Sequence, residues 1–167
     1  MRLLSIDPSL RGTGFAVMES DGRKHTALAY GVISNAPKLS QSGCLVSIHE
    51  KITELILEYR PEECAVEAVI FVQSLRTAIT LGAARGASIL AVAQHGIPIY
   101  EYAPRKIKQA VVGTGSADKK QVAFMIRAML GLTETPPADA ADALAIGLTH
   151  LHSQTGRQLR PLEADRI

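Results

Sequence analysis

The alternation of apolar and polar residues predicts three short strands in the first 34 residues of the chain. The apolar runs RLLSID, FAVMES and AYGVIS occupy residues 2–7, 15–20 and 29–34, and turns that contain glycine separate them. Consecutive strands that are joined by short turns pair in antiparallel fashion. We therefore expect the N-terminal part of the chain to form an antiparallel meander.

The rest of the chain alternates helical and strand-like patterns. From residue 44 to residue 59 apolar side chains recur at helical spacing, and Pro61 ends that segment. Two compact β-rich runs are ECAVEAVIF at residues 63–71 and IPIYEYA at residues 97–103. Periodicity and terminal residues predict four more helices, at residues 74–96, 104–113, 116–132 and 138–154. Ser116 is the expected N-cap of the third of these helices.

The order β-β-β-α-β-α-β-α-α-α predicts an α/β domain. Its centre would be a five-stranded mixed sheet with helices on both faces, which gives three layers. Residues 1–152 are expected to form this single domain. Residues 155–167 show no periodicity, and residues 153–167 are expected to be a mobile C-terminal tail.

Composition narrows the class of protein. Hydrophobic residues make up 47% of the chain and charged residues 20%, which is the balance of an ordinary globular domain. The two cysteines, Cys44 and Cys64, form no CxxC pair, so no zinc or redox motif is indicated. The sequence shows no signal peptide and no run near the ~20 apolar residues of a membrane span. A cytoplasmic location without a membrane partner is the default expectation.

The net charge of +2 is too small to indicate a nucleic-acid partner by itself. Its distribution is more informative, because five basic residues lie close together in the sequence with Asp118 as the only acid among them: Arg105, Lys106, Lys108, Lys119 and Lys120. Such a cluster suits contact with phosphates, but a solvated helix face explains it as well.

Two acidic residues sit where the pattern predicts buried strands. Asp7 follows Leu3, Leu4 and Ile6, and Glu67 lies inside AVEAVIF. A buried carboxylate without a partner costs several kcal/mol, roughly, so each needs an explanation. Asp7 is also compatible with an Asp-Pro turn, and a basic partner would account for Glu67.

Two more acids open the last predicted helix. Asp139 and Asp142 are three residues apart, which places both on one side of a helix, and small alanines surround them. Acids in a first helical turn are favourable in any case, because they interact with the helix dipole. If all four acids met at one sheet edge, they would supply the oxygen ligands that Mg²⁺ prefers.

The chain resembles the RuvC-type Holliday junction resolvases, bacterial endonucleases with a ribonuclease H-like fold. The segments that carry the resemblance span residues 3 to about 152: IDPSLRGTGFAV, AVEAV, LGAARG, EYAPRKIKQAVVGTGSADKKQV and ADAADALAIGLTH. The resemblance implies that Asp7, Glu67, Asp139 and Asp142 bind two Mg²⁺ ions per active site, with Mn²⁺ as a possible substitute. It further implies a homodimer that makes paired nicks in a four-way DNA junction and works with the RuvA–RuvB branch-migration complex in recombination and repair.

The same resemblance assigns roles to basic and aromatic residues. Lys108 and Lys119 fall on family positions near the scissile phosphate, and Lys119 is expected to be a catalytic residue. Arg105, Lys106 and Lys120 are candidates for general phosphate contacts. The family has an aromatic residue three positions after the glutamate, where this chain has Ile70 and then Phe71. Phe71 is therefore a candidate for stacking on DNA, and an ordinary core position is the alternative.

Three other functions compete with junction cleavage. The DPSLRGTG turn resembles the phosphate loop of actin-like ATP-binding proteins, but 167 residues leave no room for their second half. A ribonuclease H-like nuclease that acts on structured RNA is the second alternative. A junction-binding module without catalysis is the third, and the four acids argue against it, since a binding protein gains nothing from negative charge beside phosphate.

Overall fold

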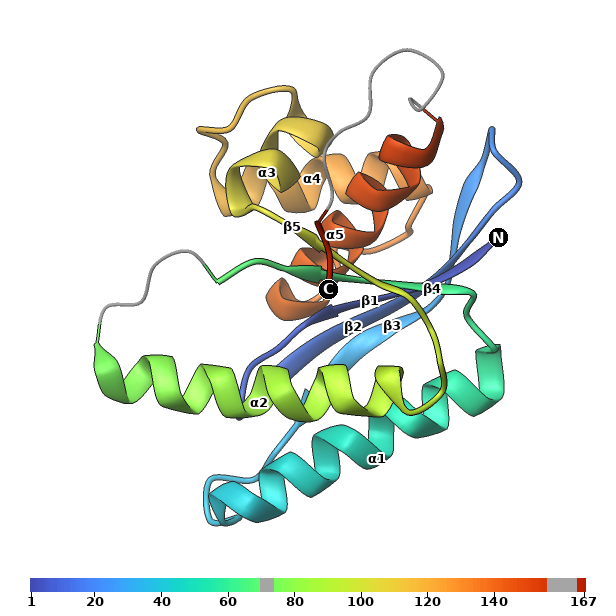
Figure 1. Ribbon diagram of the computed structural model, residues 1–167. Helices are drawn as coiled ribbons and strands as arrows, with labels where there is room; N and C mark the ends of the chain where they lie inside the picture. The colour runs from blue at the N-terminus through green and yellow to red at the C-terminus, as the bar shows by residue number, and fades with distance from the viewer. Residues whose placement is uncertain (70–73, 156–164) are drawn as a thin grey trace.

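The computed structural model describes residues 1–69, 74–155 and 165–167, which form one mixed sheet with helices on both sides (Figure 1). The sheet has the strand order β3-β2-β1-β4-β5-β6. Its strands are β1 (Arg2–Asp7), β2 (Gly12–Ser20), β3 (His25–Ser34), β4 (Glu63–Glu67), β5 (Ile99–Tyr102) and β6 (Asp165–Arg166). The first three strands pair antiparallel, whereas β4 is parallel to both β1 and β5. The predicted α/β architecture with a mixed sheet is confirmed, and the two-residue β6 extends the five expected strands.

Within the described ranges, five helices cover this sheet in the expected order. They are α1 (Gln41–Tyr59), α2 (Leu75–Ala93), α3 (Pro104–Val112), α4 (Lys119–Leu130) and α5 (Ala138–Thr155). Figure 1 shows α1 and α2 on one face of the sheet and α3, α4 and α5 on the other. The result is a three-layer domain in which the central strands β1 and β4 are buried on both sides.

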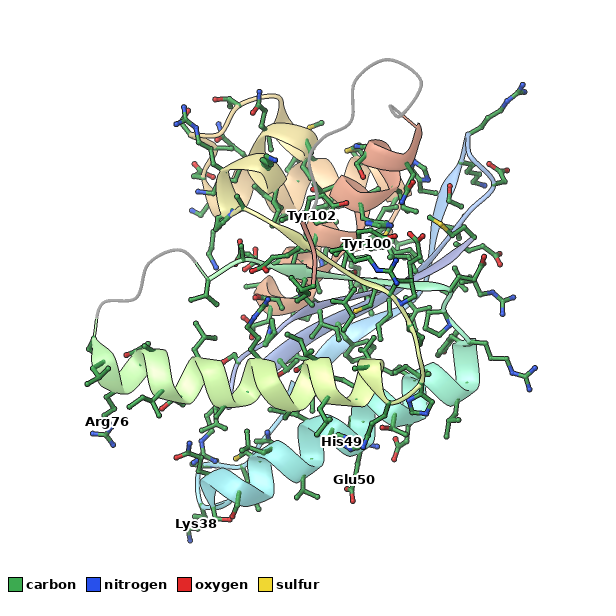
Figure 2. The ribbon with its side chains drawn as sticks, in the orientation of Figure 1. Lys38, His49, Glu50, Arg76, Tyr100 and Tyr102 are labelled. Carbon is green, nitrogen blue, oxygen red and sulfur yellow. The ribbon has the colours of Figure 1, made fainter. Side chains whose placement is uncertain are left out.

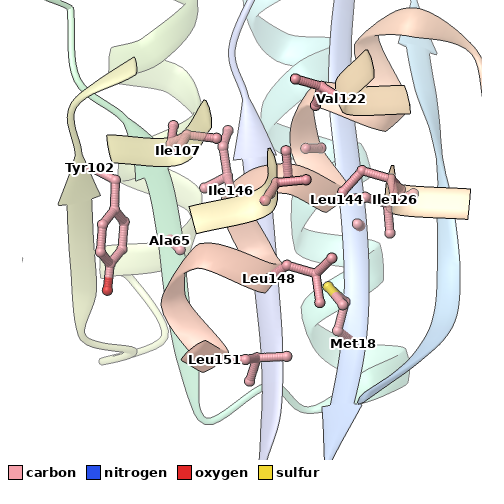
Figure 3. Close-up of a cluster of buried hydrophobic side chains, with 14 of the residues drawn as sticks. Met18, Ala65, Tyr102, Ile107, Val122, Ile126, Leu144, Ile146, Leu148 and Leu151 are labelled. Carbon is pink, nitrogen blue, oxygen red and sulfur yellow. The ribbon is translucent and has the colours of Figure 1, made fainter. Parts of the chain in front are cut away.

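Strand alternation divides the apolar side chains between two cores. Leu3 and Ala65 face α3, α4 and α5, whereas Leu4, Ile6 and Val66 face α1 and α2. Figure 3 shows the first core, where side chains from β2, β4 and β5 meet Leu144, Ile146, Leu148 and Leu151 of α5. On β5, Tyr100 and Tyr102 lie on this same side (Figure 2), and the Tyr102 hydroxyl is 2.9 Å from Nδ1 of His150 on α5. Helix α5 is thus the central helix of its layer.

Two glycines allow α5 to lie unusually close to the sheet. A Cβ atom on Gly14 would be 2.0 Å from the main-chain oxygen of Asp139, and one on Gly147 would be 2.6 Å from the sulfur of Met18. Only a residue without a side chain fits at such contacts. The close approach brings the N-terminal turn of α5 against β2, beside the end of β1.

Two local features differ from the sequence-based expectation. Asp118, not Ser116, is the N-cap of α4, because its carboxylate accepts from the Gln121 amide while the Gln121 side chain accepts from the Asp118 amide. The second is the C-terminal part of the chain, where α5 continues to Thr155 and Asp165–Arg166 pair antiparallel with β5, while the domain boundary at residue 152 stays a prediction.

Helix α2 is the one segment in the described ranges that is long and apolar enough, by length and composition alone, to cross a membrane. Alanine and leucine make an 18-residue window of this helix apolar on average, but Arg85 interrupts it, so α2 is not an uninterrupted run of ~20 apolar residues. Within the domain α2 packs against α1 and β5, and only 22% of this window is buried. The helix thus keeps an apolar face on the outside of the protein.

Candidate active site

The candidate site begins at the carboxyl ends of β1 and β4. The register of these parallel strands pairs Ile6 with Val66, so the next residues, Asp7 and Glu67, stand on neighbouring strands about 4.8 Å apart in the pairing direction. Alternation from Leu3 and Ala65 puts both carboxylates on the α5 side of the sheet. Two acids that are far apart in the sequence are therefore neighbours at one sheet edge.

The first turn of α5 adds the other two acids. Ala140, Ala141 and Ala143 are buried against the sheet, which leaves Asp139 and Asp142 partly exposed between the helix and the strands. The carboxylate of Asp139 lies over Gly12 at the start of β2, where a Cβ atom would be 2.9 Å from its Oδ2. The structure thus brings all four predicted acids to the same end of the sheet.

The electrostatics of Asp7 show how closely these acids interact. The pKa of Asp7 is raised from 3.8 to about 7, by burial first and then by the negative charges of Glu67, Asp142 and Asp139, while Lys119 lowers it. The pKa of Glu67 is also raised, by burial first and then by Asp142, against the opposing effects of Lys119 and Lys108. Without a cation, the site holds more negative charge than its two lysines offset.

Lys108 and Lys119 complete the polar lining. The ammonium of Lys119 donates to Oδ2 of Asp142 over 2.9 Å, and this bond is the first cause of the raised pKa of Lys119. Both lysines line a cleft of about 130 Å³ that also contains Glu67 and Asp142. A second cleft of about 270 Å³ also contains Glu67, together with Asp7 and Arg85. Glu67 therefore lines both clefts.

The donor set suits a hard divalent cation. The pKa values of Asp7 and Glu67 are raised partly by neighbouring carboxylates, so a bound cation would stabilise the charged forms of both, and carboxylate oxygen is the ligand that Mg²⁺ and Mn²⁺ favour. Among the residues that the structure describes, no three His, Cys, Asp or Glu side chains are arranged closely enough to form a metal site by themselves. The role of the four carboxylates as metal ligands therefore stays a prediction.

The other predicted DNA-binding residues lie outside these two clefts. Arg105 and Lys106 belong to α3, Lys120 belongs to the first turn of α4, and none of them lines either cleft. Arg105 and Lys120 are exposed. Phe71 and Ile70 lie outside the described residues. The structure thus groups Lys108 and Lys119 with the acids and leaves the three other cations on the surrounding helices.

Sequence reasoning missed Arg85. Its side chain lies in the larger cleft, beside Asp7 and Glu67. The sequence held a signal for it, because Arg85 is the single charged residue between Thr77 and Gln94, in a stretch that is otherwise apolar or small. A lone cation in such a helix needs a buried acceptor.

Known proteins with similar sequences and the same fold match nearly the whole chain. The family model for crossover junction endodeoxyribonuclease RuvC matches residues 3–150. A RuvC of Akkermansia muciniphila is 56% identical over 153 residues, with 92% of each chain covered, and one of a Bradyrhizobium species is 41% identical over 160 residues, with 96% of this chain and 91% of the relative covered. Both relatives are named crossover junction endodeoxyribonucleases.

The structural comparison agrees with the sequence comparison. The fold matches that of Thermus thermophilus RuvC in complex with a Holliday junction substrate with a TM-score of 0.90 at 35% identity, and the match covers 100% of this chain and 99% of the other. The yeast mitochondrial resolvase Ydc2 shares the fold at a TM-score of 0.63 and 11% identity, with 93% of this chain and 82% of the other covered. The chain therefore belongs to the RuvC family of crossover junction endodeoxyribonucleases, whose ribonuclease H-like fold it has.

Proposed function

We propose that this protein is an endonuclease that resolves four-way DNA junctions by paired nicks, using Mg²⁺. The observation that carries the proposal is the grouping of Asp7, Glu67, Asp139 and Asp142 with Lys108 and Lys119 at one end of the sheet. Membership of the RuvC family and the match to a relative bound to a Holliday junction support the same substrate.

The acidic residues of the site would bind the cations, and the basic residues would contact the phosphate. Asp7, Glu67, Asp139 and Asp142 would hold two divalent ions, Mg²⁺ or Mn²⁺, by their carboxylates. When bound, such ions activate the attacking water and stabilise the leaving 3′ oxygen of a phosphodiester. Lys119, which donates to Asp142 in the free protein, would turn its charge toward the scissile phosphate, and Lys108 would hold the backbone in the same cleft. Products would carry 5′-phosphate and 3′-hydroxyl ends.

A junction-cleavage assay tests this proposal. We expect a synthetic four-way junction to be cut in Mg²⁺ at symmetric positions on two strands of like polarity, and no cutting in EDTA. Linear duplex and structured RNA of equal length serve as competitors and as alternative substrates. Preferential cutting of RNA would favour the RNA-processing alternative, and tight junction binding without cutting in Mg²⁺ or Mn²⁺ would favour a silent binding module. Binding should weaken with salt, because Arg105, Lys106 and Lys120 would release counterions from phosphates.

Paired nicks require two active sites, and we propose that α2 joins two copies of the chain. Its outer stripe is apolar and exposed, with Leu75 78%, Ile79 61% and Leu90 52% exposed. Gly82 and Gly86 lie between them, with open space where a Cβ atom would be, so a second helix has room to approach closely. A continuous apolar stripe of this kind marks a protein interface more often than a solvent-facing surface.

An Ile79→Asp substitution is expected to give a monomer. Burying its carboxylate in an apolar interface would cost several kcal/mol, roughly, which exceeds what a small helix interface retains. Sedimentation should then show a monomer that binds junctions weakly and makes no paired nicks. Phe124→Asp is the control, because Phe124 is equally exposed at 66% but lies on α4, across the sheet. An Ile79→Asp dimer with full paired cutting would contradict the α2 interface.

Family membership also supports a cellular role. We infer that the protein acts in recombination and DNA repair in the cytoplasm, on junctions that the RuvA–RuvB branch-migration complex delivers. A pull-down with purified RuvA–RuvB on junction DNA tests this partnership.

A further inference from the structure

Arg85 is a largely buried cation in the middle of α2. Its side chain is 15% exposed, although every other residue from Thr77 to Gln94 is uncharged. Removing a guanidinium from water costs several kcal/mol, roughly, unless acceptors replace the lost hydration. The hydrogen-bond and ion-pair partners of Arg85 therefore indicate its structural role.

The guanidinium reaches two neighbouring strands at once. Nη1 donates to the main-chain oxygen of Glu67 on β4 over 2.8 Å, and Nη2 lies 3.1 Å from Oε1 of Glu101 on β5. The Glu101 side chain is itself only 23% exposed. A planar fork with two donors in fixed directions suits such a bridge, whereas the single ammonium of lysine does not.

The carbonyl that Arg85 binds belongs to the last residue of β4. Pairing between β1 and β4 ends at Ile6 and Val66, one residue before Glu67. On the other side, the strand is still held, because the amide of Ala68 donates to the oxygen of Tyr102 over 2.8 Å. Arg85 thus supplies a hydrogen bond to the end of β4 beyond the last residue that pairs with β1. The orientation of the Glu67 peptide in turn fixes the direction in which the Glu67 side chain leaves the main chain.

We propose that Arg85, held by Glu101, is a positioning residue that fixes the main chain at Glu67 so that the Glu67 carboxylate projects beside Asp7. This inference rests on the proposed function of Glu67 as a ligand of the divalent ions. Arg85 acts on the main chain and not as a counter-charge, since the cations that lower the pKa of Glu67 are Lys119 and Lys108. Groups that orient metal ligands in this way change metal affinity or activity by roughly 10–100-fold when removed.

Arg85→Lys is the decisive variant, because it keeps the charge and the pair with Glu101 but cannot span both acceptors. We expect kcat for junction cleavage to fall roughly 10–100-fold. The dissociation constant for the junction in EDTA should stay unchanged. In the protein without DNA, the Mn²⁺ concentration that gives half of the thermal stabilisation should rise by a similar factor. Arg127→Lys is the control, because Arg127 is exposed on α4, and it should match the wild type in all three measurements.

A purely structural role for Arg85 gives a different result. In that case Arg85→Lys would lower the melting temperature but leave kcat and the Mn²⁺ midpoint at wild-type values, which would overturn the proposal. If Arg85→Lys does not fold, Glu101→Gln is the variant to measure. It removes the charge that holds the guanidinium but leaves the hydrogen bond from Arg85 to the main-chain oxygen of Glu67 possible. A smaller fall in kcat and a smaller rise in the Mn²⁺ midpoint would support the proposal, whereas no change in either quantity would overturn it. Absence of cleavage by the wild type would instead refute the proposed function.

Discussion

Asp7→Asn is expected to abolish junction cleavage while it stabilises the metal-free protein. Asp7 is the most strongly perturbed carboxyl of the candidate site, with a pKa raised to about 7 by burial and by Glu67, Asp142 and Asp139. The amide keeps the shape of the side chain but removes the charge that would hold a divalent ion. Junction binding in EDTA should persist, because the basic residues are unchanged and the negative charge at the site is smaller.

The stabilisation should depend on pH in a defined direction. Because the folded-state pKa of Asp7 lies above 3.8, the folded protein binds the proton more tightly than the unfolded chain does. The favourable contribution of protonated Asp7 is complete below about pH 4 and is lost as the pH rises through about 7. A rise of three pKa units corresponds to roughly 4 kcal/mol, an upper bound here because Asp7 is partly exposed to solvent. The advantage of Asp7→Asn in EDTA should therefore grow from pH 4 to pH 7 and then level off.

Thermal melts in EDTA at pH 4 to 8, repeated with Mg²⁺, test both parts of this expectation. Mg²⁺ should raise the melting temperature of the wild type more than that of Asp7→Asn. Glu50→Gln is the matched control, since it also replaces a carboxylate by an amide but at an exposed position on α1 that points away from the sheet (Figure 2). Full cleavage by Asp7→Asn, or identical melts at pH 8, would rule out the electrostatic account of the site.

Local patterns sufficed to predict the parts of the fold that depend on near neighbours. Strand alternation and helical spacing gave the order of elements through α5, because burial of one face imposes those periods. Asp7 and Glu67 stood out because each is a charge in an apolar strand. Their grouping with Asp139 and Asp142 was predicted only as a possibility until the family resemblance joined them, since no local pattern states which strands are adjacent.

Two of the missed features depend on contacts between distant segments, and a third, the cap of α4, is local. Arg85 is conspicuous in the sequence as a lone cation, but its acceptor is the main chain of a residue 18 positions away, and a main-chain acceptor leaves no signature in the sequence. The capping of α4 was assigned to Ser116 because serine is a good N-cap, whereas the reciprocal bonds between Asp118 and Gln121 favour the later start. The close contact between Gly14 and Asp139 is of the same long-range kind, and it has the largest expected mutational effect outside the acids.

Gly14→Ala should displace the N-terminal turn of α5 and with it Asp139. The added methyl would be 2.0 Å from the oxygen and 2.6 Å from the carbonyl carbon of Asp139, and both are main-chain atoms that cannot rotate away. Relief requires a shift of the helix by about 1 Å or more, and displacements of that size at a reacting centre cost on the order of 100-fold in rate. Overpacking should also destabilise the domain, by roughly 1–3 kcal/mol.

Gly31→Ala is the matched control for this prediction. Its methyl would lie 3.2 Å from the ring of Phe15, a side chain that can yield by a few tenths of an ångström, so stability and cleavage should change little. The measurements are melting temperature, the Mn²⁺ midpoint of thermal stabilisation and the rate of junction cleavage. Gly14→Ala should lose cleavage and metal-dependent stabilisation together, even at temperatures where it is fully folded. Wild-type cleavage by folded Gly14→Ala would show that the position of Asp139 tolerates the shift, and Asp139 would then have no role in holding the ions.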